Sequence, residues 1–173
     1  VCDSFEGVVV PYVEDYEQAR RLAAAAVYRP LKGKDLDQVL AGGDWPSEAT
    51  RKYVTRTNCA DTVCIPMIES VEGVENLDRI CSIPGVHGVF VGPNDLTVNM
   101  GLPNEYDHPD TIAMLQKIID TADRHHVAAG CWFGTTAQAV RTIRQGARLV
   151  VYSNDALILK NAIDAAFTEL KQG

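Results

Sequence analysis

The chain has 173 residues, of which 46% are hydrophobic and 23% are charged, a composition typical of a globular domain with a real core. Acidic residues outnumber basic ones by 23 to 16 and no basic cluster is present, which argues against nucleic acid as a partner. No apolar run approaches the length of a membrane span, and the chain opens at Val1 without a basic leader, so we expect neither a membrane partner nor a signal peptide.

The cysteines are scattered along the chain and show no paired spacing. An odd number of them, five, argues against a disulfide framework, and the absence of a CxxC pair argues against a structural zinc site. Reduced thiols of this kind indicate a cytoplasmic protein. The five are Cys2, Cys59, Cys64, Cys81 and Cys131.

The first part of the chain predicts one strand–helix unit followed by an irregular stretch. Gly7–Val10 is a short β-branched run, typical of a buried parallel strand. Apolar residues then recur at helical spacing between residues 19 and 26, which predicts an amphipathic helix. Glycines and prolines punctuate residues 37–58, where we expect only a short helix near residues 47–53. Trp45 lies in this stretch, and we expect it to pack under its own loop.

The central stretch, residues 64–101, is read as strand, helix, strand and loop. An apolar run over Val63–Ile68 ends in the carboxylate of Glu69. A helical pattern with three-residue steps follows over residues 71–80, and Pro84 and Gly85 end it. A second apolar run, residues 86–91, ends in a loop of Gly92, Pro93, Asn94 and Asp95.

Glu69 and Asp95 therefore follow two successive strands that are joined by one helix. Such strands are parallel, and if they are neighbours their carboxyl ends lie about 4.8 Å apart at the same edge of the sheet. Two converging carboxylates repel each other unless a cation or a proton lies between them. With no Cys or His at ligand spacing, the expected cation is Mg²⁺ or Mn²⁺. The alternative is that both residues cap the helices that follow them.

The last part of the chain repeats the alternation of strands and amphipathic helices. His108 is an acid–base candidate by residue type, but its position before Pro109 favours a helix cap. Asp155 follows the last strand and is read as a cap as well. The expected elements are a helix to residue 126, a strand at 127–133, a helix from Thr135 closed by Gly146, a strand at 148–152 and a helix at 156–170.

Several short motifs of the central stretch resemble one known family when they are taken in order. They are Pro66 to Ser70, then Glu72, Gly73 and Asn76, then Pro84 to Val86, then Gly92 to Leu96, and Gly101. This order resembles the HpcH/HpaI aldolases, metal-dependent class II aldolases that use pyruvate. The resemblance implies an α/β fold of the parallel (β/α)₈ TIM-barrel type, a Mg²⁺ or Mn²⁺ ion on Glu69 and Asp95, and substrate binding by Gly92, Pro93, Asn94 and Asp95. The backbone N–H groups of Asn94 and Asp95 are then expected to hold the pyruvate carboxylate.

The chain accounts for about five strand–helix units of such a barrel, read here as one partial domain over residues 1–173. The resemblance places about three more units before Val1, and the catalytic His and Arg of the family fall in that part. No catalytic residue is therefore predicted within this chain. The chain also departs from the family after Pro30, where Leu31 to Asp35 replace a Gly and an Arg-Gly pair. No side-chain role is carried into that loop.

The function that the resemblance implies is aldol cleavage or condensation of 4-hydroxy-2-oxo acids through a pyruvate enolate. Its partners are pyruvate and an aldehyde, and the family implies a homo-oligomer, usually a hexamer. Two alternatives stay open. One is an acyl-CoA lyase of the citrate lyase β-subunit or malyl-CoA type, which shares the barrel and a similar carboxylate pair. The other is a truncated or structural subunit without catalysis, whose exposed strand edges need cover from a partner.

Overall fold

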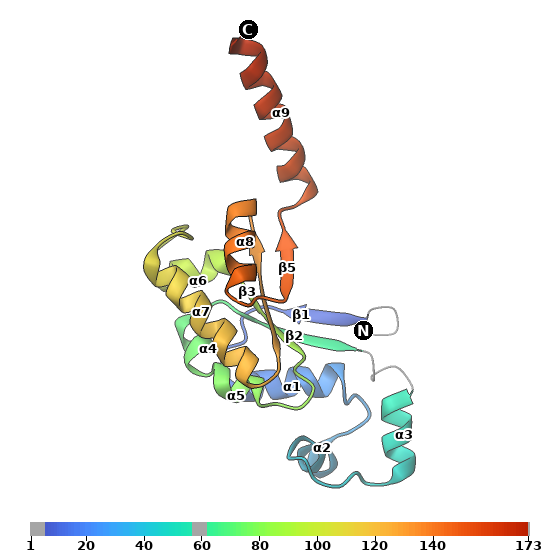
Figure 1. The fold of residues 1–173 in the computed structure, drawn as a ribbon. Helices are drawn as coiled ribbons and strands as arrows, with labels where there is room; N and C mark the ends of the chain where they lie inside the picture. The colour runs from blue at the N-terminus through green and yellow to red at the C-terminus, as the bar shows by residue number, and fades with distance from the viewer. Residues whose placement is uncertain (1–5, 57–61, 173) are drawn as a thin grey trace.

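The computed structural model describes residues 6–56 and 62–172, whose strands form one parallel sheet in the order β1-β2-β3-β4-β5. Each strand pairs with the next one along the chain, and the sheet curls into an open half-barrel with helices between the strands (Figure 1). Sequential order is the order of a (β/α)₈ barrel, whereas doubly wound folds reverse direction within the sheet. The predicted fold class is confirmed. The strands are β1 Gly7–Val10, β2 Val63–Ile68, β3 Gly88–Val91, β4 Ala128–Phe133 and β5 Leu149–Tyr152.

Several helices pack against the sheet, whereas the C-terminal helix extends away from it (Figure 1). Apolar stripes such as Ala19 and Ala23 in α1 are fully buried, as the helical spacing predicts. The predicted caps also form, because His108 and Thr135 accept hydrogen bonds from the amides of Asp110 and Gln138. The helices are α1 Tyr16–Ala26, α2 Gly33–Leu40, α3 Glu48–Arg56, α4 Val71–Glu75, α5 Leu77–Cys81, α6 Pro93–Asn99, α7 Pro109–Arg124, α8 Thr136–Arg144 and α9 Asp155–Gln172.

Three local expectations differ from the structure. The chain before α3 is not irregular, because Leu36, Val39 and Leu40 bury one face of α2 at helical spacing. The helix expected over residues 71–80 is split into α4 and α5 at Asn76, whose side chain donates to the carbonyl of Glu14 at 2.9 Å. The loop expected after β3 is the first turn of α6, with Pro93 at a position where a missing N–H costs no hydrogen bond.

Helix α9 extends away from the sheet, and none of its residues is buried (Figure 1). Its exposed large apolar side chains, among them Ile158, Leu159 and Phe167, are between 45% and 76% exposed. The helix start is capped by Asn154, which accepts from the amide of Leu157 at 2.8 Å, beside the predicted cap Asp155. The helix is thus placed as predicted, but the rest of the described chain buries none of its apolar residues.

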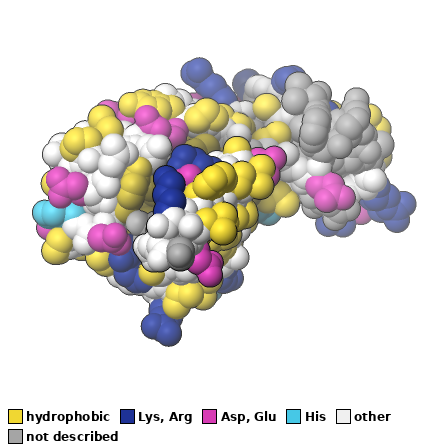
Figure 2. Space-filling view, turned by 90° about the horizontal axis from the view of Figure 1, so that it is seen from above, with side chains coloured by type: hydrophobic (Ala, Val, Ile, Leu, Met, Phe, Trp, Pro, Cys, Tyr) yellow, Lys and Arg dark blue, Asp and Glu magenta, His cyan; other side chains and the backbone are white. Residues whose placement is uncertain are grey.

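Charged and hydrophobic side chains are mixed on one face of the molecule (Figure 2). On the face seen in Figure 2, Lys and Arg side chains are scattered among acidic and hydrophobic ones and form no continuous band. In residues 6–56 and 62–172, no helix is long and apolar enough to cross a membrane.

Three cysteines, Cys64, Cys81 and Cys131, are buried and unpaired, whereas Cys2 and Cys59 lie outside the described residues. Burial raises the pKa of each of the three thiols to about 12. Only the thiolate is nucleophilic, so these thiols are shielded in the folded chain. Their unfolded pKa is lower, so the free energy of unfolding is unaffected below pH 9 and falls as pH rises from 9 towards 12.

A thiol-labelling rate checks this burial. In a variant with Cys2 and Cys59 replaced by Ser, we expect the folded chain to react with a disulfide reagent at pH 8 about 1,000-fold more slowly than the urea-unfolded chain. Absorbance of the released chromophore measures both rates. Comparable rates in the two states contradict the buried placement.

Candidate metal and substrate site

Glu69 and Asp95 come to one edge of the sheet, as their spacing predicts. Strands β2 and β3 are parallel neighbours with Ile68 opposite Val91, so the residues that follow both strands leave at the same end. A pocket with about 480 Å³ of empty space, its open mouth included, lies there. Its lining residues are Met67, Glu69, Phe90, Gly92, Pro93, Asn94, Asp95 and Trp132. The four residues predicted to bind substrate therefore lie beside both predicted metal ligands, although these roles stay predictions.

The Glu69 side chain is held from two sides. It is only 7% exposed, and its Oε2 accepts a hydrogen bond from the backbone N–H of Tyr12 at 2.8 Å. Tyr12 follows β1 and has a left-handed φ of 58°, an uncommon conformation for a bulky residue that is often found at functional sites. On the other side, a Cβ at Gly92 would lie 2.7 Å from Cγ and 2.8 Å from Cδ of Glu69. The carboxylate therefore occupies space that only glycine leaves free.

The Asp95 residue is exposed, and its carboxylate has no hydrogen bond or ion pair within the part of the chain that the structure describes. It lies in the first turn of α6, whose N-cap, Gly92, provides no side-chain bond. Helix α4 is capped instead by Ser70, whose Oγ accepts from the amide of Gly73 at 3.1 Å. Neither Glu69 nor Asp95 thus accepts a capping hydrogen bond, and the capping alternative loses its main support.

Trp132 forms the apolar wall of the pocket together with Met67 and Phe90. Its indole Nε1 donates to the carbonyl of Ser153 at 3.2 Å, which fixes the ring between the ends of β4 and β5. The other tryptophan, Trp45, packs against Tyr28 with ring centroids 6.3 Å apart, and it does not line this pocket. Trp45 therefore packs against Tyr28, on the other side of α2 in the chain, rather than only under its own loop as expected.

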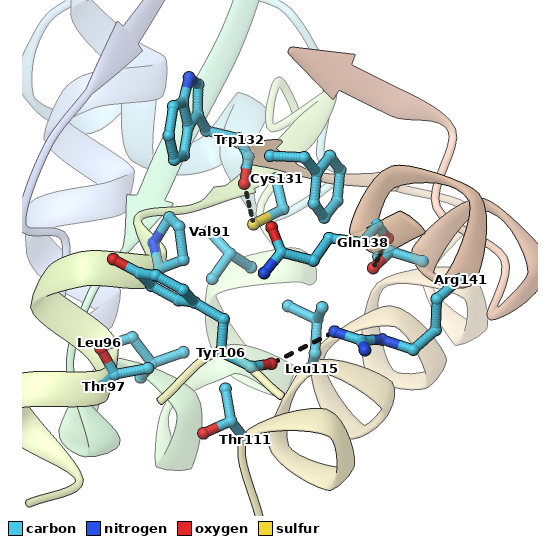
Figure 3. A pocket seen from close by; sticks show the side chains of 13 residues that line it. Val91, Leu96, Thr97, Tyr106, Thr111, Leu115, Cys131, Trp132, Gln138 and Arg141 are labelled. Carbon is cyan, nitrogen blue, oxygen red and sulfur yellow. Dashed lines mark hydrogen bonds between the residues drawn. The ribbon is translucent and has the colours of Figure 1, made fainter. Parts of the chain in front are cut away.

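A second, mostly apolar cavity lies behind the first pocket, between β4 and helices α6, α7 and α8 (Figure 3). Pro93 and Trp132 line both spaces. Tyr106 reaches across this cavity, and Arg141 donates to the Tyr106 carbonyl at 3.2 Å. The turn over Gly92 to Asp95 is thus backed by a cavity whose lining includes Tyr106 and Arg141.

The sequence analysis missed Tyr12, Tyr106 and Trp132. Tyr12 and Trp132 stand at the carboxyl ends of predicted strands, and that position alone could have placed them at the same edge as Glu69. Tyr106 has no such signal, because it comes from the connection between two helices. Among the described residues, no group of three or more His, Cys, Asp or Glu side chains could hold a metal ion. A metal here would rest on Glu69 and Asp95, with water or substrate oxygens as further ligands, as is usual for Mg²⁺.

Comparison with known proteins identifies the family of this chain. The family model described as "HpcH/HpaI aldolase/citrate lyase" matches residues 1–161. The chain belongs to this family. The resemblance seen in the motifs is thereby confirmed.

Two HpcH/HpaI relatives are the 2-keto-3-deoxy-L-rhamnonate aldolases of Shigella sonnei and Escherichia coli. Each is 31% identical to this chain over 172 residues, which cover 96% of this chain and 61% of the relative. The chain therefore spans less than two thirds of the length of these aldolases.

Solved structures show the same fold. An HpcH/HpaI family protein from Burkholderia cenocepacia matches with a TM-score of 0.78 and 27% identity, covering 96% of this chain and 65% of that one. The citrate lyase β subunit from M. tuberculosis, complexed with oxaloacetate and magnesium, matches with a TM-score of 0.52 and 13% identity. The latter covers 90% of this chain and 59% of that one, and it shows similarity of fold alone.

Proposed function

We propose that this chain provides the metal and keto-acid site of a carbon–carbon lyase, an aldolase that acts on 4-hydroxy-2-oxo acids. The observation that carries the proposal is the convergence of Glu69 and Asp95 on one pocket, while neither side chain caps a helix. Two carboxylates with no cation of the chain between them fit a hard divalent ion, Mg²⁺ or Mn²⁺. The oxaloacetate and magnesium bound by the related citrate lyase subunit support the same class of ion and ligand.

The reaction breaks the bond between C3 and C4 of the acid. The C4 hydroxyl loses its proton to a base and C4 becomes the aldehyde carbon, while the electron pair of the broken bond forms the enolate of pyruvate, which takes up a proton at C3 to give pyruvate. When bound, the metal supplies Lewis acidity that stabilises negative charge on the keto oxygen. The backbone N–H of Tyr12 holds the Glu69 carboxylate, and the absence of a side chain at Gly92 leaves room for it. The N–H groups of Asn94 and Asp95 have no intrahelical acceptors and would donate to the carboxylate of the acid, whereas Pro93 has no N–H. No lysine lines the pocket, so no Schiff base is proposed.

The relatives favour an aldolase over an acyl-CoA lyase. The aldolases named for a 2-keto-3-deoxy sugar acid share 31% identity with this chain, whereas the citrate lyase β subunit shares 13%.

We also propose that the protein is cytoplasmic and that it assembles into a homo-oligomer, with the hexamer as the expected form. The uncovered apolar side chains of α9 support assembly, and the three buried free thiols support a reducing compartment.

A fluorescence titration tests the metal site. In a Trp45→Phe variant, Trp132 is the remaining tryptophan, and it lines the same pocket as Glu69 and Asp95. Because Mn²⁺ is paramagnetic, we expect it to quench Trp132 emission, Mg²⁺ to reverse the quenching by competition, and pyruvate to tighten Mn²⁺ binding by about tenfold through linkage. In the matched Trp132→Phe variant, the emission of Trp45 should not respond. A folded sample in which Mn²⁺ changes neither emission nor calorimetric heat contradicts the proposal.

Activity then separates the remaining readings. Cleavage of a 4-hydroxy-2-oxo acid without coenzyme A, coupled to pyruvate detection, supports the aldolase. A requirement for coenzyme A thioesters supports the acyl-CoA lyase. Metal binding without any turnover supports a role without catalysis.

A further inference from the structure

Asn94 carries a side chain whose orientation is fixed from outside the pocket. The hydroxyl of Tyr106 lies 2.6 Å from Oδ1 of Asn94 and 2.8 Å from Oδ1 of Asn104. Tyr106 comes from the connection between α6 and α7, and Asn94 lines the candidate pocket. The tyrosine thus links a surface connection to a residue of the predicted substrate-binding turn.

The connection that carries Tyr106 is itself held firmly. Thr97, which is fully buried, donates to the Asn94 carbonyl at 2.9 Å and accepts from the Asn104 amide at 3.2 Å. Arg141 of α8 donates to the Tyr106 carbonyl at 3.2 Å (Figure 3), and it also donates to Asp107 at 2.7 Å. Burial raises the pKa of the Tyr106 hydroxyl above its ordinary value of 10, so the group keeps its proton at neutral pH.

The Tyr106 hydroxyl carries a single proton, and this determines whether the oxygen or the NH₂ group of the Asn94 side chain faces away from Tyr106. A tyrosine hydroxyl donates one hydrogen bond, and the shorter contact goes to Oδ1 of Asn94. Oδ1 of Asn104 also faces the hydroxyl, but at 2.8 Å its contact is longer than the 2.6 Å contact of Asn94. The NH₂ group of Asn94 is left without a partner in the described part of the chain.

We propose that Tyr106 orients the Asn94 amide so that its NH₂ group donates to the carboxylate of the keto acid in the pocket. This inference rests on the proposed function, and it adds a side-chain donor to the backbone donors already suggested. Tyr106 is a positioning residue, because it acts through Asn94. Asn94 is the residue that contacts the acid.

Binding of pyruvate to the Mn²⁺-loaded chain tests this role. Losing one hydrogen bond to pyruvate costs about 1 kcal/mol of binding free energy. We therefore expect Tyr106→Phe to weaken pyruvate binding by about fivefold and Asn94→Ala by at least as much. The double variant should bind pyruvate no more weakly than Asn94→Ala alone, because both changes remove one interaction. The affinity for Mn²⁺ without pyruvate should stay unchanged in all three. Tyr152→Phe, which removes an exposed hydroxyl on β5, serves as the control.

Additive losses in the double variant, or equal losses of Mn²⁺ affinity in Tyr106→Phe, overturn the inference and indicate a structural role only. If the wild-type chain binds no Mn²⁺, the proposed metal site is wrong. The role of Tyr106 is then tested by titrating the wild type and Tyr106→Phe with pyruvate in the absence of metal. Nitrogen–proton correlation spectra then follow the side-chain NH₂ signal of Asn94. A shift in the wild type that is absent in Tyr106→Phe supports the role of Tyr106, and no shift in the wild type overturns it.

Discussion

Replacing Glu69 with Gln is expected to lower the affinity of the chain for Mn²⁺ by about 100-fold or more, because even groups that only orient a metal ligand contribute about 10- to 100-fold. Gln has nearly the same shape, and its amide oxygen can still accept the hydrogen bond that the Tyr12 amide gives to Glu69. The change therefore removes the negative charge and leaves the local fold in place. Isothermal titration calorimetry measures the affinity, and urea unfolding measures the free energy of unfolding.

The matched control is Glu72→Gln. Glu72 is an exposed carboxylate in the first turn of α4, three residues from Glu69, and it does not line the pocket. Its loss should leave Mn²⁺ affinity within about twofold, since exposed charges at a distance are screened by salt. Equal Mn²⁺ affinities in wild type and Glu69→Gln, in samples of equal stability, would remove Glu69 from the site.

The fold could be predicted where local patterns and burial agree. Gly7–Val10 and Val63–Ile68 are β-branched or apolar runs bounded by turn signals, and both strands form at the expected residues. The break between α4 and α5 could not be predicted in this way. It depends on the Asn76 side chain reaching the Glu14 carbonyl, a contact between residues 62 positions apart. Helix α2 was missed because a Gly and charged residues obscure its short apolar stripe.

The candidate site could likewise be predicted only in part. Glu69 and Asp95 could be placed together because strand ends in a parallel sheet converge, and this depends only on the order of the elements. The groups that orient Glu69 and Asn94 come from elsewhere in the fold. Tyr12 reaches Glu69 through its backbone, which no side-chain pattern reveals, and Tyr106 reaches Asn94 from a connection between two helices. Such contacts become visible only once the tertiary structure is known.

Gly92→Ala is expected to lower the free energy of unfolding by about 1–3 kcal/mol, the usual cost of an added methyl group in a packed position. The φ of Gly92 is −87°, which alanine adopts easily, so backbone strain is not the cause. The cause is overlap between the new Cβ and the Glu69 side chain. The same overlap should displace the carboxylate and lower Mn²⁺ affinity by about tenfold or more, because metal sites tolerate little change in ligand position.

A double-mutant cycle isolates this overlap from any other effect of the substitution. When Glu69 is first replaced by Ala, the space beside Gly92 is open, and adding Gly92→Ala should then change the free energy of unfolding by less than about 0.5 kcal/mol. Urea unfolding of the four proteins gives the coupling free energy directly. An equal loss of stability in both backgrounds would show that Glu69 does not occupy the space beside Gly92. If Gly92→Ala lowers the free energy of unfolding only when Glu69 is present, and also weakens Mn²⁺ binding, then glycine is required at this position because the Glu69 carboxylate lies against it.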